Sequence, residues 1–184
     1  MLDQYSRNID YIRISVTDRC NLRCIYCMPQ TRKTYLRQEE LLTYDEIVKL
    51  AGIYRSLGIK NVKLTGGEPL VREHVDELIF RLKEECGMEK VTLTTNGILL
   101  GQQLEGIVKA RLDGVNISLD TLNPRTFEEI TRVDALNQVL SSIEKALQAG
   151  LQVKINCVPC QEWNGEDLTD IAALARQYPL DVRF

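Results

Sequence analysis

Six short segments of the chain alternate apolar and polar residues, and a longer helical pattern follows each of the first five. The segments are residues 11–16, 61–65, 90–95, 115–119, 153–158 and 181–184. A period of two predicts strands with one buried face. Apolar residues at helical spacing predict helices between the Thr43–Glu46 capping box and Gly58, at 75–85, 101–110, 135–149 and 165–177 behind an Asn164 cap, and a helical turn from Pro124.

Strands that alternate with helices form right-handed βαβ units around a parallel sheet. We therefore predict an α/β fold, an incomplete (β/α)6 barrel that forms one domain over residues 1–184. The sequence stops inside the sixth predicted strand, with no helix to cover it. We expect the chain to be the first part of a longer protein, with a naturally short protein as the alternative.

The two faces of the predicted sheet differ in polarity. One face carries Ile12, Ile14, Val62, Leu64, Val91, Leu93, Val115, Ile117, Val153, Ile155, Val182 and Phe184; the other carries Arg13, Ser15, Lys63, Thr65, Thr92, Thr94, Asn116, Ser118, Lys154, Asn156 and Arg183. The apolar face must meet the helices, so the polar face lines the barrel. An ordinary barrel packs branched aliphatic residues there, and this interior instead suits a ligand.

Four of the inward residues are cations from four different strands, namely Arg13, Lys63, Lys154 and Arg183. Grouped cations repel one another unless an anion lies among them. We expect a substrate with several negative charges, phosphates being the first choice. The alternative is that each cation pairs with a local carboxylate such as Asp120 or Glu68.

The composition, with 44% hydrophobic and 27% charged residues, is that of an ordinary globular protein. The net charge of −3 gives no reason to expect nucleic acid or an acidic membrane as partner. No apolar run approaches the roughly 20 residues that span a bilayer, and the first residues lack the apolar core of a signal peptide. We expect a cytoplasmic protein whose thiols stay reduced.

Three cysteines, Cys20, Cys24 and Cys27, lie within eight residues directly after the first predicted strand. Three thiolates are one short of the four that close a structural zinc site or an iron–sulfur cluster held only by protein. One coordination position is then open for chemistry. A zinc site completed by a distant ligand, disulfides and plain packing are the alternatives, and the spacing alone does not separate zinc from iron–sulfur.

The other unusual motifs also follow strands. They are Gly66-Gly67-Glu68-Pro69, Thr95-Asn96-Gly97 and Ser118-Leu119-Asp120. The carboxyl ends of parallel strands meet at one edge of the sheet, where active sites of α/β folds lie. We therefore expect these loops to share one site with the cysteines.

The spacing Cys20-x3-Cys24-x2-Cys27, followed by Gly-Gly-Glu-Pro, resembles the radical S-adenosylmethionine (SAM) superfamily. Residues 13–29, 64–72, 93–97 and 116–120 resemble in particular its GTP 3′,8-cyclase family, lyases that begin molybdenum cofactor biosynthesis. The resemblance covers essentially the whole chain and only the N-terminal barrel of that family.

The resemblance implies that Cys20, Cys24 and Cys27 hold a [4Fe-4S] cluster whose fourth iron binds the amino and carboxylate groups of SAM. An electron then cleaves SAM to a 5′-deoxyadenosyl radical, which takes hydrogen from C3′ of GTP. The product in the family is (8S)-3′,8-cyclo-7,8-dihydroguanosine 5′-triphosphate. A flavodoxin or ferredoxin is the implied electron donor, and no catalytic side chain beyond the cluster is implied.

The resemblance also implies two sets of binding residues. The SAM set is Tyr26, Gly66, Gly67, Asn96 and Ser118, and the GTP set is Arg13, Lys63, Thr94, Lys154 and Arg183. Most of the GTP set are the cations already found by alternation. We further expect the glycines to leave backbone groups accessible to the methionine amino group, because side chains there would block its approach.

The chain departs from the family in two ways. The family usually has Arg where this chain has Lys63, and a C-terminal portion with a second [4Fe-4S] cluster is missing from these 184 residues. We expect incomplete turnover and, through an exposed sheet edge, a homodimer or poor solubility. The alternatives are a radical SAM enzyme that modifies a peptide or a haem precursor, and a non-catalytic metal-binding module.

Overall fold

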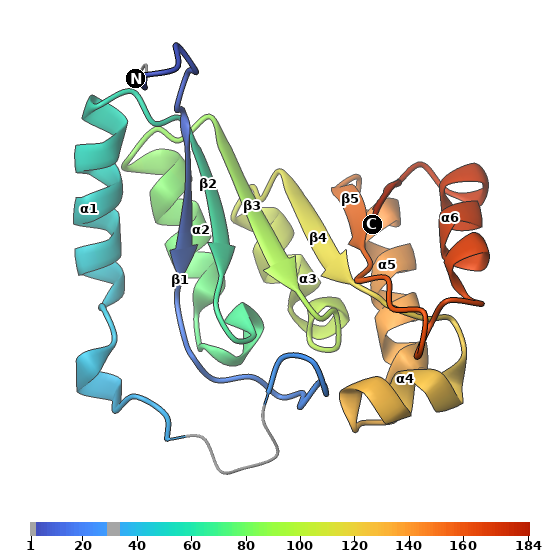
Figure 1. Cartoon of the computed structure of the whole chain (residues 1–184). Coiled ribbons are helices and arrows are strands. Elements are labelled where there is room, and N and C mark those ends of the chain that lie inside the picture. Colours follow the sequence, from blue (N-terminus) through green and yellow to red (C-terminus); the bar gives the residue numbers. More distant parts are fainter. Residues whose placement is uncertain (1–2, 29–33) are drawn as a thin grey trace.

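The computed structural model describes residues 3–28 and 34–184. Its centre is one parallel sheet in the order β1-β2-β3-β4-β5-β6 (Figure 1). The strands are β1 (Tyr11–Ser15), β2 (Asn61–Thr65), β3 (Lys90–Thr95), β4 (Gly114–Ser118), β5 (Gln152–Asn156) and β6 (Asp181–Arg183). The strands run in chain order without closing on each other, so the predicted α/β partial barrel is confirmed.

The α-helices of the described residues lie partly behind the sheet and partly along its edges in Figure 1. They are α1 (Tyr44–Ser56), α2 (Val75–Glu84), α3 (Leu100–Lys109), α4 (Pro124–Thr131), α5 (Leu136–Gln148) and α6 (Leu168–Gln177), with short 3-10 helices at Gln38–Glu40 and Pro69–Val71. The predicted capping box starts α1: the Thr43 side chain accepts from the Glu46 amide, and the Glu46 side chain accepts from the Thr43 amide. Within the described residues, the helices are all too short or too polar to cross a membrane.

The hydrophobic core lies between the sheet and these helices. Its central strand residues are almost completely buried, namely Val62, Leu64, Val91, Leu93, Val115, Ile117 and Ile155. These are residues of the predicted apolar face. Among the described residues, no helix lies on the opposite face of the sheet (Figure 1). That face carries the polar strand residues, which are half-buried or exposed. Alternation therefore identified both faces correctly.

Some predicted boundaries were wrong. β4 and β5 each begin one residue earlier than predicted, and α6 begins at Leu168 with Asp167 as its N-cap. Asn164 does not cap this helix. Its side-chain nitrogen Nδ2 instead donates to the backbone oxygens of Asp120 and Val158, and its side-chain oxygen accepts from the Cys160 backbone amide. Residues 29–33, which include the end of the cysteine motif match and the start of the predicted connection to the first helix, lie outside the described residues.

Candidate functional site

The loops after the first four strands meet in one pocket of about 220 Å³, as their position predicted. We call it the cysteine pocket. Its lining includes Cys20, Cys24, Tyr26, Cys27, Gly67, Glu68, Thr94, Asn96, Ser118 and Asp120. All three cysteines of the motif thus open on the same cavity as the Gly-Gly-Glu-Pro, Asn-Gly and Ser-Leu-Asp loops. The pocket combines thiols, carboxylates and neutral polar groups.

The cysteines of the pocket are free thiols, as are Cys86, Cys157 and Cys160, so the disulfide alternative finds no support. Burial raises the pKa of Cys24 to about 12, with further contributions from Cys20, Asp120 and Cys27. Burial also raises the pKa of Cys20. In residues 3–28 and 34–184, no three His, Cys, Asp or Glu side chains gather closely enough to hold one metal ion. The thiols line the pocket without converging on a single point.

Gly66 and Gly67 lie in the loop after β2. They allow this second loop to pass close to the cysteine loop, which is the loop that follows β1 and carries the three cysteines. A β-carbon on Gly66 would lie 2.5 Å from the Thr17 carbonyl oxygen, and one on Gly67 would lie 2.2 Å from the Arg19 carbonyl oxygen. The Gly67 amide donates to Thr17 O at 2.7 Å, and the Glu68 amide donates to Arg19 O at 2.7 Å. The glycines therefore make room for protein backbone, a reason for them that sequence reasoning did not give, and their predicted role toward the methionine amino group stays a prediction. Only Gly67 lines the pocket.

Glu68 joins the second and third loops, although it is only 1% exposed. Its carboxylate accepts from the Leu70 amide, the Thr95 hydroxyl and the Asn96 amide, at 2.6 to 3.0 Å. Burial raises the pKa of Glu68, and these hydrogen bonds oppose that rise. Sequence reasoning considered Glu68 only as a partner for a cation. Two of its partners lie 27 and 28 residues away, so no local pattern reveals them.

Asn96 reaches from the third loop to the cysteine loop. Its amide nitrogen donates to Asn21 Oδ1 at 2.7 Å and lies 3.9 Å from Cys20 Sγ. Its side-chain oxygen accepts from the Ile98 amide, which fixes the orientation of the side chain. The residue therefore lies beside the thiol of Cys20.

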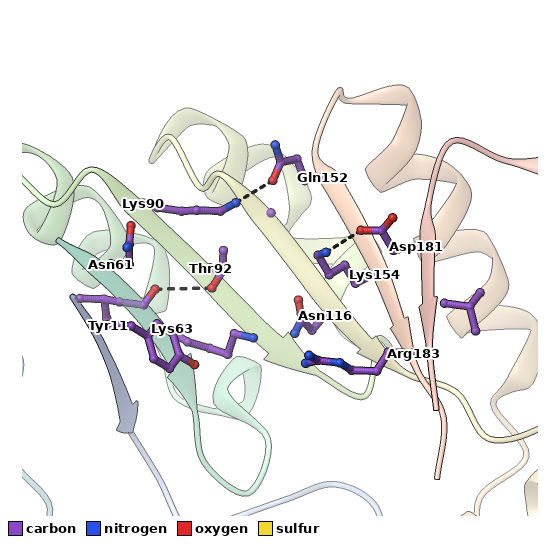
Figure 2. A pocket seen from close by; sticks show the side chains of 13 residues that line it. Tyr11, Asn61, Lys63, Lys90, Thr92, Asn116, Gln152, Lys154, Asp181 and Arg183 are labelled. Carbon is purple, nitrogen blue, oxygen red and sulfur yellow. Dashed lines mark hydrogen bonds and ion pairs between the residues drawn. The ribbon is translucent and has the colours of Figure 1, made fainter. Parts of the chain in front are cut away.

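A second pocket, of about 500 Å³, lies on the inner face at the other end of the strands (Figure 2). The first residue of every strand lines it: Tyr11, Asn61, Lys90, Gly114, Gln152 and Asp181. Lys63, Lys154 and Arg183 also line it. Of the predicted GTP set, Thr94 lies in the cysteine pocket instead, and Arg13 lines neither pocket but pairs in register with Lys63.

The cations of this second pocket, which we call the cationic pocket, have few carboxylate partners. Lys154 pairs with Asp181, with 2.5 Å between Nζ and Oδ2, and Lys90 donates to the neutral Gln152 at 2.8 Å. Among the described residues, Arg13, Lys63 and Arg183 form no ion pair. Burial lowers the pKa of Lys63, as do the neighbouring charges of Arg13, Arg183, Lys154 and Lys90. The alternative considered from sequence, that each cation pairs with a local carboxylate, is found among the described residues for Lys154 only, and its partner is Asp181 instead of Asp120 or Glu68.

Lys90 is a residue of the cationic pocket that the sequence prediction missed. It is the first residue of β3 and shares a face with Thr92 and Thr94, since side chains two apart point the same way. Extending the alternation by one step toward the start of the strand would have found it.

Comparison with known proteins supports the same interpretation. Residues 14–175 match the family model described as Radical SAM superfamily. Over the whole chain, the sequence is 47% identical to the GTP 3′,8-cyclase of Clostridium perfringens (strain SM101 / Type A) and 46% identical to that of Petrotoga mobilis. The chain spans 57% of the length of each of these relatives.

Solved structures share the fold at much lower identity. SuiB of Streptococcus suis, in complex with its precursor peptide SuiA, superposes with a TM-score of 0.73 at 21% identity, over 95% of this chain and 39% of SuiB. Methylornithine synthase (PylB) superposes with a TM-score of 0.73 at 17% identity, over 96% of this chain and 53% of that one. These likenesses concern the arrangement of strands and helices.

Proposed function

The chain belongs to the radical SAM superfamily, and from this premise we propose that it forms the cluster-, SAM- and phosphate-binding part of a GTP 3′,8-cyclase. One observation carries the proposal: three free thiols open on the same pocket as Gly67, Asn96 and Ser118, and a cationic pocket lies further along the same inner face. The identity of 47% to a GTP 3′,8-cyclase supports the choice of reaction.

The residues of the cysteine pocket fit a [4Fe-4S] cluster. Three thiols from Cys20, Cys24 and Cys27 supply the donor set for three irons and leave the fourth for SAM. Thiols that spread around a cavity, without a common point, suit a cluster better than a single zinc ion, since each thiolate binds a different iron. The bound cluster supplies the electron that cleaves SAM to the 5′-deoxyadenosyl radical.

The SAM site is the remainder of that pocket. We assign the methionine end of SAM to the neighbourhood of Gly67, with Gly66 positioning the loop, and its carboxylate to Ser118. Asn96 holds the cysteine loop and lies within reach of the cofactor, and Tyr26 lies between two cluster ligands. A radical enzyme needs a site that excludes water during the reaction, so that the radical meets its substrate.

The substrate occupies the inner face from the cysteine pocket to the cationic pocket. We assign the triphosphate to Lys63, Lys154 and Arg183, with Arg13 beside Lys63, because these cations otherwise repel one another. Thr94, which lies in the cysteine pocket, is then closest to the ribose end of GTP. This orientation brings the sugar toward the SAM site.

Other parts of the proposal concern the whole enzyme. We propose that a second [4Fe-4S] cluster is bound by a portion outside these residues, and that a flavodoxin or ferredoxin delivers the electron. The free thiols favour a cytoplasmic setting. β1 and β6 are edge strands within the described sheet, and a second copy of the chain is the partner we propose for them.

The test is anaerobic reconstitution with iron and sulfide, followed by reduction with SAM, with and without GTP. We expect 5′-deoxyadenosine in both cases and Cys24→Ala to abolish it, while Cys86→Ala, a thiol outside the pocket, leaves it intact. Deoxyadenosine from the Cys24→Ala variant would contradict the ligand assignment. Deoxyadenosine without a cyclised nucleotide, also when the longer protein is used, would contradict GTP as the substrate. Bound zinc without labile sulfide would overturn the enzyme proposal.

A further inference from the structure

Tyr26 connects the cysteine loop to a distant part of the chain. It lies between Cys24 and Cys27 in the sequence, and its hydroxyl donates to Asp120 Oδ2 at 2.5 Å, across 94 residues. Hydrogen bonds to carboxylates are shorter and stronger than those between neutral groups. Among the described residues, this is the only side-chain hydrogen bond made by segment 24–28.

Asp120 is a fixed acceptor. It follows β4, is 7% exposed, and its other carboxylate oxygen accepts from the Val158 amide at 2.8 Å. Its backbone oxygen accepts from Asn164 Nδ2 at 2.7 Å. Asn164 also bonds to Val158 O and to the Cys160 amide, so the loop after β5 braces Asp120 from two sides. The Tyr26 hydroxyl therefore donates to a carboxylate whose position is fixed by hydrogen bonds from Val158 and Asn164.

The first half of the cysteine loop is attached to the loops after β2 and β3 through Thr17, Arg19 and Asn21, and its second half has further contacts of its own. The amides of Arg23 and Ile25 donate to Thr131 O and Ile130 O of α4, at 3.1 and 2.9 Å. The Tyr26 ring stacks on Trp163, with 6.0 Å between ring centroids and an angle of 19° between the planes. Tyr26 is 41% exposed, so this stacking buries only part of it. The hydroxyl contact is the deeply placed one.

We propose that Asp120 is a positioning residue for the cluster: through the Tyr26 hydroxyl it holds the cysteine loop against α4, so that Cys24 and Cys27 face the pocket both before and after the cluster binds. The inference rests on the proposed cluster site but concerns this chain's own residues. We call the hydrogen bond from Tyr26 to Asp120 the tether. Without it the loop keeps its thiols but moves away from the pocket more often, so a bound cluster is lost faster.

The first test uses the metal-free chain and needs no cluster. Amide hydrogen exchange of Arg23 and Ile25 reports each opening of the loop away from α4. Tyr26→Phe removes only the hydroxyl, and we expect these two amides to exchange about tenfold faster, the effect of losing one hydrogen bond to a charged group. Tyr44→Phe is the matched control, since the Tyr44 hydroxyl donates to Glu73 O at 2.7 Å, away from the cysteine pocket.

A double-mutant cycle separates the tether from general destabilisation. In an Asp120→Ala background, Tyr26→Phe should no longer change the exchange of Arg23 and Ile25. An equal effect in both backgrounds would overturn the proposal, as would exchange that quickens equally in α5. If Asp120→Ala does not fold, Tyr26→Phe against Tyr44→Phe decides: equal exchange of the loop amides overturns the tether.

The second test uses the reconstituted chain. We expect an iron chelator to bleach the cluster absorption of Tyr26→Phe several times faster than that of wild type and Tyr44→Phe. Equal rates would overturn the tether in the loaded state. A wild-type chain that takes up no cluster would contradict the proposed function instead, while the exchange of the metal-free chain still decides on the contact between Tyr26 and Asp120.

Discussion

Lys154 on β5 and Asp181 on β6 are register partners and form an ion pair, with 2.5 Å between Nζ and Oδ2. Asp181 is the one carboxylate among the described residues that line the cationic pocket (Figure 2). It therefore occupies the lysine that we assign to substrate phosphate. A phosphate that binds Lys154 has to compete with Asp181 and with its negative charge.

Removal of this competitor should strengthen phosphate binding. We expect Asp181→Asn to bind inorganic triphosphate about two- to fivefold more tightly, the range expected for one exposed ion pair. Isothermal titration calorimetry at low ionic strength measures the change. Asp170→Asn, at an exposed position of α6, makes the same change in net charge away from the pocket. Equal affinities of the two variants would show that Asp181 does not compete for the site.

Lys63 should make the free protein less stable near neutral pH. Burial and the neighbouring cations lower its pKa in the folded protein, whereas the unfolded chain has the ordinary value of 10.5. The charged form is thus disfavoured by folding. The charge on Lys63 lowers the free energy of unfolding at every pH below the folded pKa. This loss disappears as the pH rises from the folded pKa toward 10.5.

From this sign we expect Lys63→Met to raise the free energy of unfolding at pH 7 by up to about 1 kcal/mol. The gain should shrink as the pH rises toward 10.5, because the folded wild type also loses the charge in that range, and it should shrink in high salt, which screens the repulsion. Denaturant unfolding measures it. Lys49→Met, at an exposed site of α1, should show no gain, and a gain that stays constant with pH would contradict the electrostatic explanation.

The same position should tune phosphate affinity. A guanidinium binds phosphate through two parallel hydrogen bonds, which an ammonium cannot do. We expect Lys63→Arg to bind triphosphate about two- to fivefold more tightly than wild type and Lys63→Met at least about tenfold more weakly. Titration of the three proteins under one buffer gives the order. If Lys63→Met binds as well as wild type, the triphosphate lies elsewhere.

Periodicity predicted the fold because a half-buried sheet repeats the same environment at every second residue. Val62 and Lys63 point to opposite faces, and each was placed on the correct one. Asn164 shows the limit of local reasoning. Asparagine is a good N-cap, yet here its side chain bonds to Asp120 and Val158, and these tertiary contacts move the helix start to Leu168.

The candidate site was predicted in part. The motifs placed Cys20, Asn96 and Ser118 at the carboxyl ends of strands, and the structure brings them together. Alternation names which residues face inward, but it does not say how deep each lies. For that reason the separation of Thr94 from Lys63 into two pockets was not predicted. The bonds of Glu68 to Asn96 and of Tyr26 to Asp120 join residues 28 and 94 apart, beyond any local signal.

The close passage of two loops at Gly67 gives the sharpest prediction for the site. A β-carbon there would lie 2.2 Å from Arg19 O and 2.6 Å from Arg19 C, both rigid backbone atoms. Gly67→Ala must push the loops apart. It must also break the hydrogen bonds that the Gly67 amide donates to Thr17 O and the Glu68 amide donates to Arg19 O. We expect a loss of about 2 to 4 kcal/mol in the free energy of unfolding, with reduced cluster uptake.

Gly52→Ala is the matched control, because a β-carbon on Gly52 in α1 would meet no atom within 4 Å. Alanine there should stabilise the helix by up to about 1 kcal/mol. If both variants change stability equally in denaturant unfolding, the glycine is not needed for the contact between the loops, and the contacts of the cysteine loop through Tyr26 and with Asn96 and α4 must suffice to hold it.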